Sequence, residues 1–507
     1  MRILPTPFAT PGTWPVPHPG GFHPALLPAL IEGPGQEALR ARLAEPGALV
    51  VTTGQQPALF TGPLYAVHKA LSAAALARLL SAAWKRPVLP LFWVASDDHD
   101  YAEANHAAWL RPDGSLHVEV LPERPAEAAL RPMSHEPLGP AIGPALDALA
   151  ADLSAFDGRD EVLGWLRAHF QPGATLGHAS GRALAELLAP LGVLCLDGSH
   201  AALKARAAPV VRRALEEAEG IERALVARAA TLAAEGRDSG VSVGDGATLV
   251  MLEGAQGRDR LVRDGAGVAA RHGGERYAMA EVLDLLAREP ARFSGNVLLR
   301  PVIERAVLPT VAYVAGPGEL RYLALAEAVY GHLGMERQLP VPRWSGLLVE
   351  PRVDRVLAKF GASLEELLAP DQRLEGRVAR GHLPPQAMVA LDALRAAIES
   401  EYGVLESVAG EVDPTLLRPI QGLKGRALQG AGKAEKKLVQ HLKRRHEMET
   451  EQIGRARTAV QPAGRPQERV VILAPYLARY GPGILPSLLD AMVDWYGSAL
   501  EGGAPPS

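Results

Sequence analysis

The stretch ALVVTTGQQPALFTGPLYAVHK, Ala48 to Lys69, decides the fold class of this 507-residue chain. Residues Ala48–Thr52 form an apolar run, which is typical of a buried strand. Residues Lys69–Ala82 place leucines and alanines on one side of a helix, and the glycines and prolines between the two segments predict a tight loop. A buried strand that leads through such a loop into a helix is the first half of a βαβ unit.

The same alternation continues along the chain. Further strands are expected at Val88–Ala95, Val193–Leu196, Thr248–Leu252, Asn296–Arg300 and Thr310–Val314. Helical patterns separate them at Pro140–Arg167, Gly181–Leu188 and Lys204–Ala234. Apolar strands separated by helices predict an α/β fold with a mostly parallel sheet and helical inserts. Ligands of such sheets bind beyond the carboxyl ends of the strands, so functional residues are expected there.

After Glu350 the pattern changes to long helices. Asp413-Pro414 predicts the start of a second long helix, which continues to about Val460. The first helix follows Pro384-Pro385, and its apolar residues have the spacing of a coiled-coil seam: Leu391, Leu394, Ile398, Tyr402, Leu405 and Val412. We therefore expect a core at 1–350, an antiparallel coiled-coil arm at 351–465 that pairs two subunits, and a segment at 466–507 that returns to the core.

The amino-acid composition of the chain argues against some classes of binding partner. The 53 Lys and Arg against 57 Asp and Glu give a formal net charge of −4, which argues against nucleic acid or an anionic membrane as the main partner. No apolar run of about 18 residues is present, so no membrane span is expected, and the N-terminus lacks the apolar segment of a signal peptide. The single cysteine, Cys195, excludes an intramolecular disulfide and favours the cytoplasm. Because Cys195 lies inside the strand segment VLCLD, we expect a buried, inert thiol.

The loop after the first strand is the first candidate site. Gly54, Gln55 and Gln56 precede a helix whose first backbone N–H groups point into the loop, which suits an anionic group. Glutamine amides both donate and accept hydrogen bonds, which suits a carboxylate or a sugar. His68 and Lys69 follow on the helix and are expected to reach back. The alternative is a purely structural turn.

The second candidate is FWVASDDHDYAEANH, Phe92 to His106, which follows another predicted strand. Four acids and one histidine fall within seven residues: Asp97, Asp98, His99, Asp100 and Glu103. A general base site needs a histidine whose tautomer is set by a carboxylate, and a metal site needs converging oxygen and imidazole ligands. We favour the base over the metal, since consecutive acids point in different directions, and expect no metal. The third alternative is a capped helix start with solvated acids.

The third candidate is NVLLRPVIERAVLPTVAYVAGPGELRYL, Asn296 to Leu323. Arg300 follows a predicted strand and can clamp a carboxylate with two parallel hydrogen bonds. Gly316 and Gly318 form a strand-to-helix turn that admits a close ligand, and Glu319 can accept from an amine or hydroxyl. All three candidates follow predicted strands.

Together these segments resemble one family, the cysteine-adding ligases of bacillithiol biosynthesis. The resemblance extends to PVPRWSGLLVE and to PQERVVILAPYLARYGP at Pro466–Pro482, so it spans most of the chain. It implies a Rossmann-like core of the nucleotidyl-transferase type, helical inserts and a C-terminal coiled coil that makes a homodimer. It also implies the last step of bacillithiol synthesis, in which cysteine is joined to glucosaminyl-malate as an amide.

The family elements map onto the candidate segments. GQQ falls on Gly54 to Gln56, and GPGE falls on Gly316 to Glu319 with Tyr322 just after it. The acidic element falls on Asp97 to Asp100, followed by Glu103 and Asn105, and the Arg-Pro pair on Arg300-Pro301. Three positions depart from the family: Ser96-Asp97 replaces Gly-Glu, Glu304-Arg305 reverses a local charge pattern, and Ile472 replaces an Asn.

The resemblance implies a mechanism, and two other functions stay open. Amide formation needs an activated carboxylate, so ATP with magnesium is the expected co-substrate, although no phosphate-binding loop is visible. His99 is the expected base, oriented by Asp98 or Asp100, with Gln55, Gln56 and Arg300 holding substrate carboxylates. The alternatives are a non-catalytic nucleotide-fold scaffold dimerised by its coiled coil, and a metal-dependent hydrolase that uses the Asp97–Glu103 cluster.

Overall fold

The computed structural model describes residues 1–17, 20–125 and 127–500, and these fall into two compact units. The core unit comprises Ile3–Pro112, Leu116–Leu347 and the chain from Arg465 onward. The helical unit comprises Leu348–Gly464 together with Met1–Arg2 and Asp113–Ser115. The C-terminal segment therefore belongs to the same unit as the strands near the N-terminus.

A six-stranded sheet forms the centre of the core unit. Its order is β14 (Leu339–Pro342), β13 (Thr310–Ala315), β3 (Leu49–Gln55), β4 (Val88–Val94), β7 (Leu194–Asp197) and β2 (Leu30–Ile31). All neighbours are parallel except the edge strand β2, which pairs antiparallel with β7. The prediction of a mostly parallel sheet is thus confirmed. Strand β4 lies on one side of β3 and β13 lies on the other, so the strand order reverses at β3.

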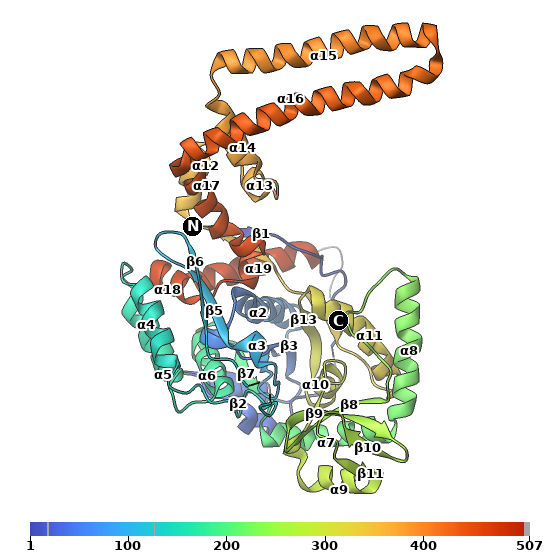
Figure 1. Ribbon diagram of the computed structural model, residues 1–507. Helices are drawn as coiled ribbons and strands as arrows, with labels where there is room; N and C mark the ends of the chain where they lie inside the picture. The colour runs from blue at the N-terminus through green and yellow to red at the C-terminus, as the bar shows by residue number, and fades with distance from the viewer. Residues whose placement is uncertain (18–19, 126, 501–507) are drawn as a thin grey trace. The chain divides into compact units, whose positions relative to one another are not determined.

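Helices cover both faces of this sheet. Helix α2 (Leu64–Trp84) connects β3 to β4, packs on both, and is itself covered by α19 (Ile484–Leu500), as Figure 1 shows. On the opposite face, Val50 of β3 and Leu91 of β4 share one core with Leu203 of α7 (Ala201–Glu216) and Val302 of α10 (Arg300–Val307). This two-sided burial explains why the central strands read as unbroken apolar runs.

A second sheet is antiparallel and was not expected. Its order is β11 (Arg276–Ala278), β10 (Gly267–Ala270), β9 (Gly257–Asp264), β8 (Ala247–Gly254) and β12 (Phe293–Gly295). The predicted strand Thr248–Leu252 exists as part of β8, but it lies in this sheet. The predicted strand Asn296–Arg300 is wrong, because the Asn296 side chain accepts from the backbone N–H groups of Leu298 (3.0 Å) and Leu299 (3.1 Å) and turns the chain into α10.

Two long predicted helices are each divided. The region Pro140–Arg167 contains α4 (Ile142–Asp152) and α5 (Arg159–His169), and Lys204–Ala234 contains α7 and α8 (Ala218–Ala234). Gly158 precedes α5, and a Cβ there would lie 2.8 Å from the Ala478 carbonyl oxygen, so only glycine fits this close approach without a shift of the backbone. The other elements of the core unit are α1 (Glu37–Leu43), α3 (Tyr101–Ala104), β5 (His106–Leu110), β6 (Leu116–Val120), α6 (Leu176–Leu188), α9 (Met279–Arg288), α11 (Pro317–His332) and α18 (Ala474–Tyr480). Strands β1 (Arg2–Pro5) and β15 (Gly346–Val349) complete the set of strands.

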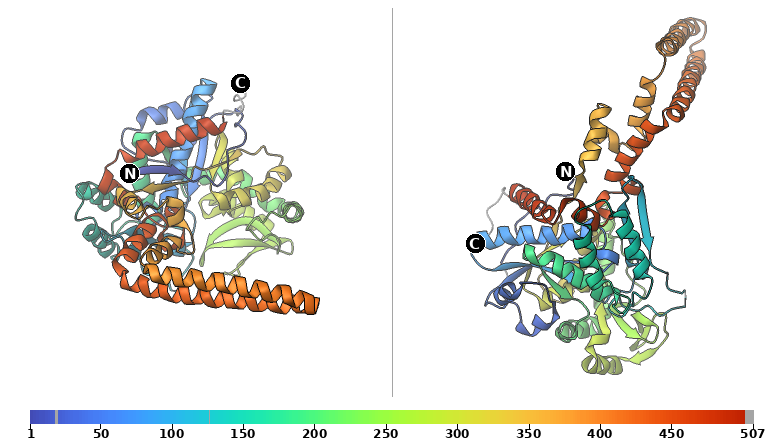
Figure 2. Two further views of the ribbon diagram at one scale, coloured as in Figure 1. Left: turned by 90° about the horizontal axis from the view of Figure 1, so that it is seen from above. Right: turned by 90° about the vertical axis from the view of Figure 1, so that its left-hand side faces the viewer.

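The helical unit is dominated by a hairpin of two long helices, α15 (Pro385–Val412) and α16 (Leu417–Arg445), which lie side by side in Figure 2. Its shorter helices are α12 (Pro351–Lys359), α13 (Leu364–Leu368), α14 (Arg373–Gly381) and α17 (Glu447–Val460). Leu391 of the predicted seam is buried, but Leu394 is 46% and Leu405 49% exposed. The hairpin therefore leaves much of its apolar surface uncovered. No helix in the described part of the chain combines the length and hydropathy that a membrane crossing requires.

The thiol of Cys195 is expected to be unreactive in the folded protein. The residue is fully buried in β7, and burial raises the pKa of its thiol to about 12, so almost no thiolate is available near neutral pH. A chromogenic disulfide reagent should therefore label the chain only after unfolding in denaturant. Rapid labelling of the native protein would contradict this burial.

Candidate functional site

A cavity of about 510 Å³ opens in the core unit beyond the carboxyl ends of β3, β4 and β13. This is the point at which the strand order reverses, the usual ligand position in open α/β sheets. Most of the predicted site residues line it: Gly54, Gln55, Gln56, Lys69, Asp97, Asp98, His99, Glu103, Arg300, Gly316, Gly318, Glu319 and Tyr322. The Gln56 side chain donates to the Asp100 carbonyl oxygen at 2.5 Å, which joins the first two candidate segments.

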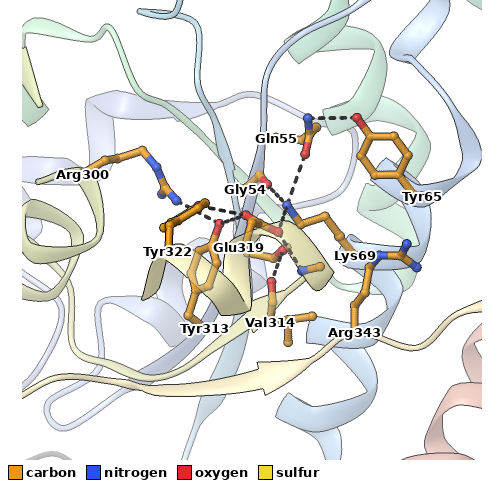
Figure 3. Close-up of polar contacts among 12 residues, drawn as sticks. Gly54, Gln55, Tyr65, Lys69, Arg300, Tyr313, Val314, Glu319, Tyr322 and Arg343 are labelled. Atoms are coloured by element: carbon orange, nitrogen blue, oxygen red, sulfur yellow. Dashed lines mark hydrogen bonds and ion pairs between the residues drawn. The ribbon is translucent and has the colours of Figure 1, made fainter. Parts of the chain in front are cut away.

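Lys69 is the most enclosed cation of the cavity wall, at 1% exposure. Its ammonium group lies 2.7 Å from Glu319 Oε2 and donates to Gln55 Oε1 (3.2 Å) and to the Gly54 carbonyl oxygen (Figure 3). Burial lowers the pKa of Lys69, and the neighbouring Glu319 opposes that shift. Three acceptors satisfy the three N–H groups of the ammonium, so Lys69 fixes the end of β3 to the start of α11.

A second chain of contacts runs from Arg300 to the same glutamate. Arg300 Nη2 donates to Tyr313 Oη at 3.0 Å, and Tyr313 donates to Glu319 Oε1 at 2.6 Å (Figure 3). Arg300 Nη1 donates to the fully buried Glu304 at 3.1 Å. Thr52 also donates to Glu304, at 2.5 Å. Glu304, a departure from the family pattern, is thus the buried counter-ion that holds Arg300 in place.

His99 is oriented by an arginine. Arg258 Nη1 lies 3.1 Å from His99 Nδ1, while the rest of the guanidinium donates to Ser294 Oγ (2.8 Å) and the Gly295 carbonyl oxygen (2.9 Å). A guanidinium only donates, so Nδ1 must accept and the neutral ring carries its hydrogen on Nε2. Asp98 Oδ1 is 3.8 Å from Nδ1, beyond hydrogen-bond distance, and accepts instead from the His99 backbone N–H at 2.7 Å.

The protonation state of His99 follows from the same contacts. Burial lowers its pKa, Arg258 lowers it further, and Asp98 opposes both. The ring is therefore neutral at neutral pH, with its accepting nitrogen already occupied. In this arrangement His99 presents an N–H donor to the cavity instead of a free lone pair.

Two carboxylates of the cavity wall, Asp97 and Glu103, are shifted in opposite directions. For Asp97, burial would raise the pKa, but Lys204, whose Nζ lies 2.5 Å away, and Arg258 lower it overall. For Glu103, burial raises the pKa, and the nearby Asp100 and Asp98 raise it further. A pair of acids whose pKa values are pushed apart separates a permanent anion from a proton acceptor. Glu103 is the residue of this pair that fits a general base.

Three predicted residues lie outside the cavity wall. His68 is fully buried, with Nδ1 at 2.9 Å from Glu468 Oε2 and its ring against Trp344, because neighbours on a helix point about 100° apart and Lys69 takes the cavity side. Asp100 caps α3 by accepting from the Glu103 backbone N–H. The buried Asn105 donates to the Leu121 carbonyl oxygen at 3.1 Å.

Several wall residues were absent from the sequence-based set, among them Tyr65, Arg258, Arg260, Arg343 and Arg469. Arg343 and Arg469 lie in segments that carry the family resemblance, which is the signal that could have identified them. Arg258 and Arg260 come from β9 of the antiparallel sheet, where a charged hairpin gives no such signal. Among the described residues, neither Arg260 nor Arg469 forms an ion pair.

Comparison with known proteins gives matches along most of the chain. A family model described as "Bacillithiol biosynthesis BshC, N-terminal Rossmann-like domain" matches residues 36–344, and one described as "Bacillithiol biosynthesis BshC, C-terminal coiled-coil domain" matches residues 346–495. A protein of Koribacter versatilis named "Putative cysteine ligase BshC" is 33% identical over 88% of this chain and 82% of its own length. A protein of the same name from Solibacter usitatus is 31% identical over 92% of this chain and 87% of its own length. One from Heliobacterium modesticaldum is 33% identical over 90% of this chain and 83% of its own length.

Proposed function

Because this chain belongs to the BshC family of bacillithiol biosynthesis and is a ligase, we propose that it joins cysteine to glucosaminyl-malate through an amide bond. The observation that carries the proposal is one cavity that holds a neutral N–H donor, a carboxylate of raised pKa and unpaired arginines. These are the groups needed for an acyl oxygen, an amine proton and substrate carboxylates. The charged cavity also favours a ligase over a scaffold that binds no small molecule.

Substrate carboxylates are assigned to the unpaired arginines. The malyl group carries two carboxylates, and an arginine binds a carboxylate with two parallel hydrogen bonds. Arg260 and Arg469 line the cavity without an ion pair among the described residues, whereas Lys69, Arg300 and Arg343 already have acidic partners. We therefore assign the malyl carboxylates to Arg260 and Arg469.

The reacting groups are assigned to His99 and Glu103. ATP with magnesium is the proposed energy source, since a free carboxylate does not condense with an amine in water. The glucosamine nitrogen forms the new C–N bond at the cysteinyl carbonyl carbon, and the bond to the activating group breaks. His99 Nε2–H donates to the carbonyl oxygen, where negative charge develops, and Glu103 accepts the proton that leaves the nitrogen.

The test is a reconstituted reaction followed by mass spectrometry. Product should appear only when cysteine, glucosaminyl-malate and ATP with magnesium are all present, and His99→Ala and Glu103→Gln should each lower kcat by about 10² to 10⁴-fold. Cys195→Ala is the matched control and should keep wild-type activity. Absence of product with all three substrates would refute the function. Product without ATP would refute the energy source alone, and wild-type rates in both variants would refute the two roles.

The uncovered apolar surface of the α15–α16 hairpin is proposed to pair two copies of the chain. Val404, Leu405 and Val408 are 58%, 49% and 49% exposed, which is unusual for neighbouring apolar residues on a helix. The double variant Leu405→Glu with Val408→Glu should convert a dimer to a monomer in size-exclusion chromatography with light scattering. Val226→Glu, an equally exposed position on α8, should leave the mass unchanged. A wild-type monomer would rule the pairing out.

A further inference from the structure

Three side chains with metal-binding atoms converge in the helical unit. His382 directly follows α14, His446 stands at the break between α16 and α17, and Glu449 lies in the first turn of α17. One ligand atom from each residue lies within 4.8 Å of the other two. The residues come from segments more than sixty positions apart in the sequence, and they meet because α14 packs against α16 and α17.

The contacts inside this cluster are close. His382 Nε2 lies 2.7 Å from Glu449 Oε2, and the two imidazole rings stack with centroids 3.7 Å apart and planes 8° from parallel. The side chains of His382 and Glu449 are 33% and 29% exposed, so an ion from solvent can reach them. A neutral imidazole is the form that binds a metal.

The helix break that presents His446 has no cause in its own sequence. His446 has φ −106° and ψ 45°, outside the helical region, yet the surrounding residues RRHEME include no proline or glycine. Sharp helix breaks usually occur at such residues or where another group is accommodated. Here the break places the His446 ring on His382 and brings Glu449 within one turn of it.

We propose that His382, His446 and Glu449 form a site for a divalent transition metal of the zinc type. Two imidazole nitrogens and one carboxylate oxygen are a common protein donor set for zinc, with a fourth position left for water. Magnesium and calcium prefer oxygen ligands alone and fit this set poorly. Tetrahedral zinc would bring the ligand atoms to about 3.3 Å from one another, so the stacked rings must tilt toward the ion. The bound metal would clip the end of α14 to the break between α16 and α17.

The proposal is tested with zinc alone on the full-length, chelator-treated protein. Calorimetric titration should show one strong site per chain, and cobalt added instead should give the visible absorption of a tetrahedral complex. His446→Ala and Glu449→Gln should each weaken binding at least tenfold and remove the cobalt spectrum. These readouts do not depend on catalysis.

His441→Ala is the matched control, since His441 is exposed on α16 five residues before His446. It should keep both the affinity and the spectrum. Equal zinc binding by the wild type and His446→Ala, or no binding by the wild type above that of the double variant His382→Ala with His446→Ala, would overturn the proposal. Circular dichroism of each variant separates loss of the site from loss of the helices.

Discussion

Glu468→Ala is expected to destabilise the core unit by about 3–5 kcal/mol, because it leaves a buried arginine without its counter-ion. The Glu468 carboxylate accepts from Arg343 at 2.5 and 3.0 Å, from Ser345 Oγ at 2.8 Å, and faces His68 Nδ1 at 2.9 Å. The side chains of Arg343 and Glu468 are only 3% and 5% exposed. Burial would raise the pKa of Glu468, but His68 and Arg343 lower it well below its usual range, so the charge persists across ordinary pH.

Urea unfolding followed by tryptophan fluorescence measures this effect, since Trp344 packs against His68 with ring centroids 5.0 Å apart. The matched control is Glu327→Ala, which removes a carboxylate whose pairs with Arg228 and Arg337 are partly exposed. Such surface pairs contribute about 0–1 kcal/mol, so the control should unfold close to the wild type. If Glu468→Ala unfolds at the same urea concentration as Glu327→Ala, the buried cluster does not stabilise the core.

Arg258→Met is expected to lower kcat about 10²-fold and to raise the pKa of the His99 imidazole, which NMR titration of the ring measures. The first effect follows because the variant releases the ring of His99 from its fixed tautomer. The second follows from the pKa of His99, which burial and the Arg258 charge lower. In the wild type the ring therefore stays neutral to a lower pH than a free imidazole does. Without the guanidinium the pKa rises, and the ring becomes protonated at a higher pH.

Arg260→Met provides the comparison, because it removes a cavity-lining arginine from the same strand that makes no contact with His99. This variant should raise KM for glucosaminyl-malate while the pKa of His99 stays at its wild-type value. Identical His99 titration curves for the wild type and Arg258→Met would show that Arg258 does not control His99. The experiment thus distinguishes a positioning residue from a substrate-binding one.

The sequence predicts those site residues whose positions follow from the local strand and loop patterns. Gln55 and Gly316 each follow a strand whose apolar run is visible in the sequence, and parallel strands bring their carboxyl ends to one edge. The residues that were missed depend on long-range packing. Arg258 reaches His99 only because the antiparallel sheet lies against the central one, and its own strand, GRDRLVRD, resembles a solvated hairpin.

The spacing of residues within one segment also predicts poorly where their side chains point. His68 and Lys69 were both expected to reach the loop, although adjacent residues on a helix cannot face the same way. Asp98 was expected to orient His99, but its carboxylate accepts from nearby backbone N–H groups instead. Which side chain meets which partner is decided by packing, and no pattern within a single segment contains that information.

The cavity combines residues that lie far apart in the sequence, such as Gln55 and Arg469. During synthesis on the ribosome, the strand that carries Gln55 exists long before Arg469 has been added. A growing chain can assemble the sheet but not the complete cavity wall, and Arg343 lacks Glu468 until the chain has been extended past that residue. A chain that ends before Arg469 is therefore expected to lack the activity.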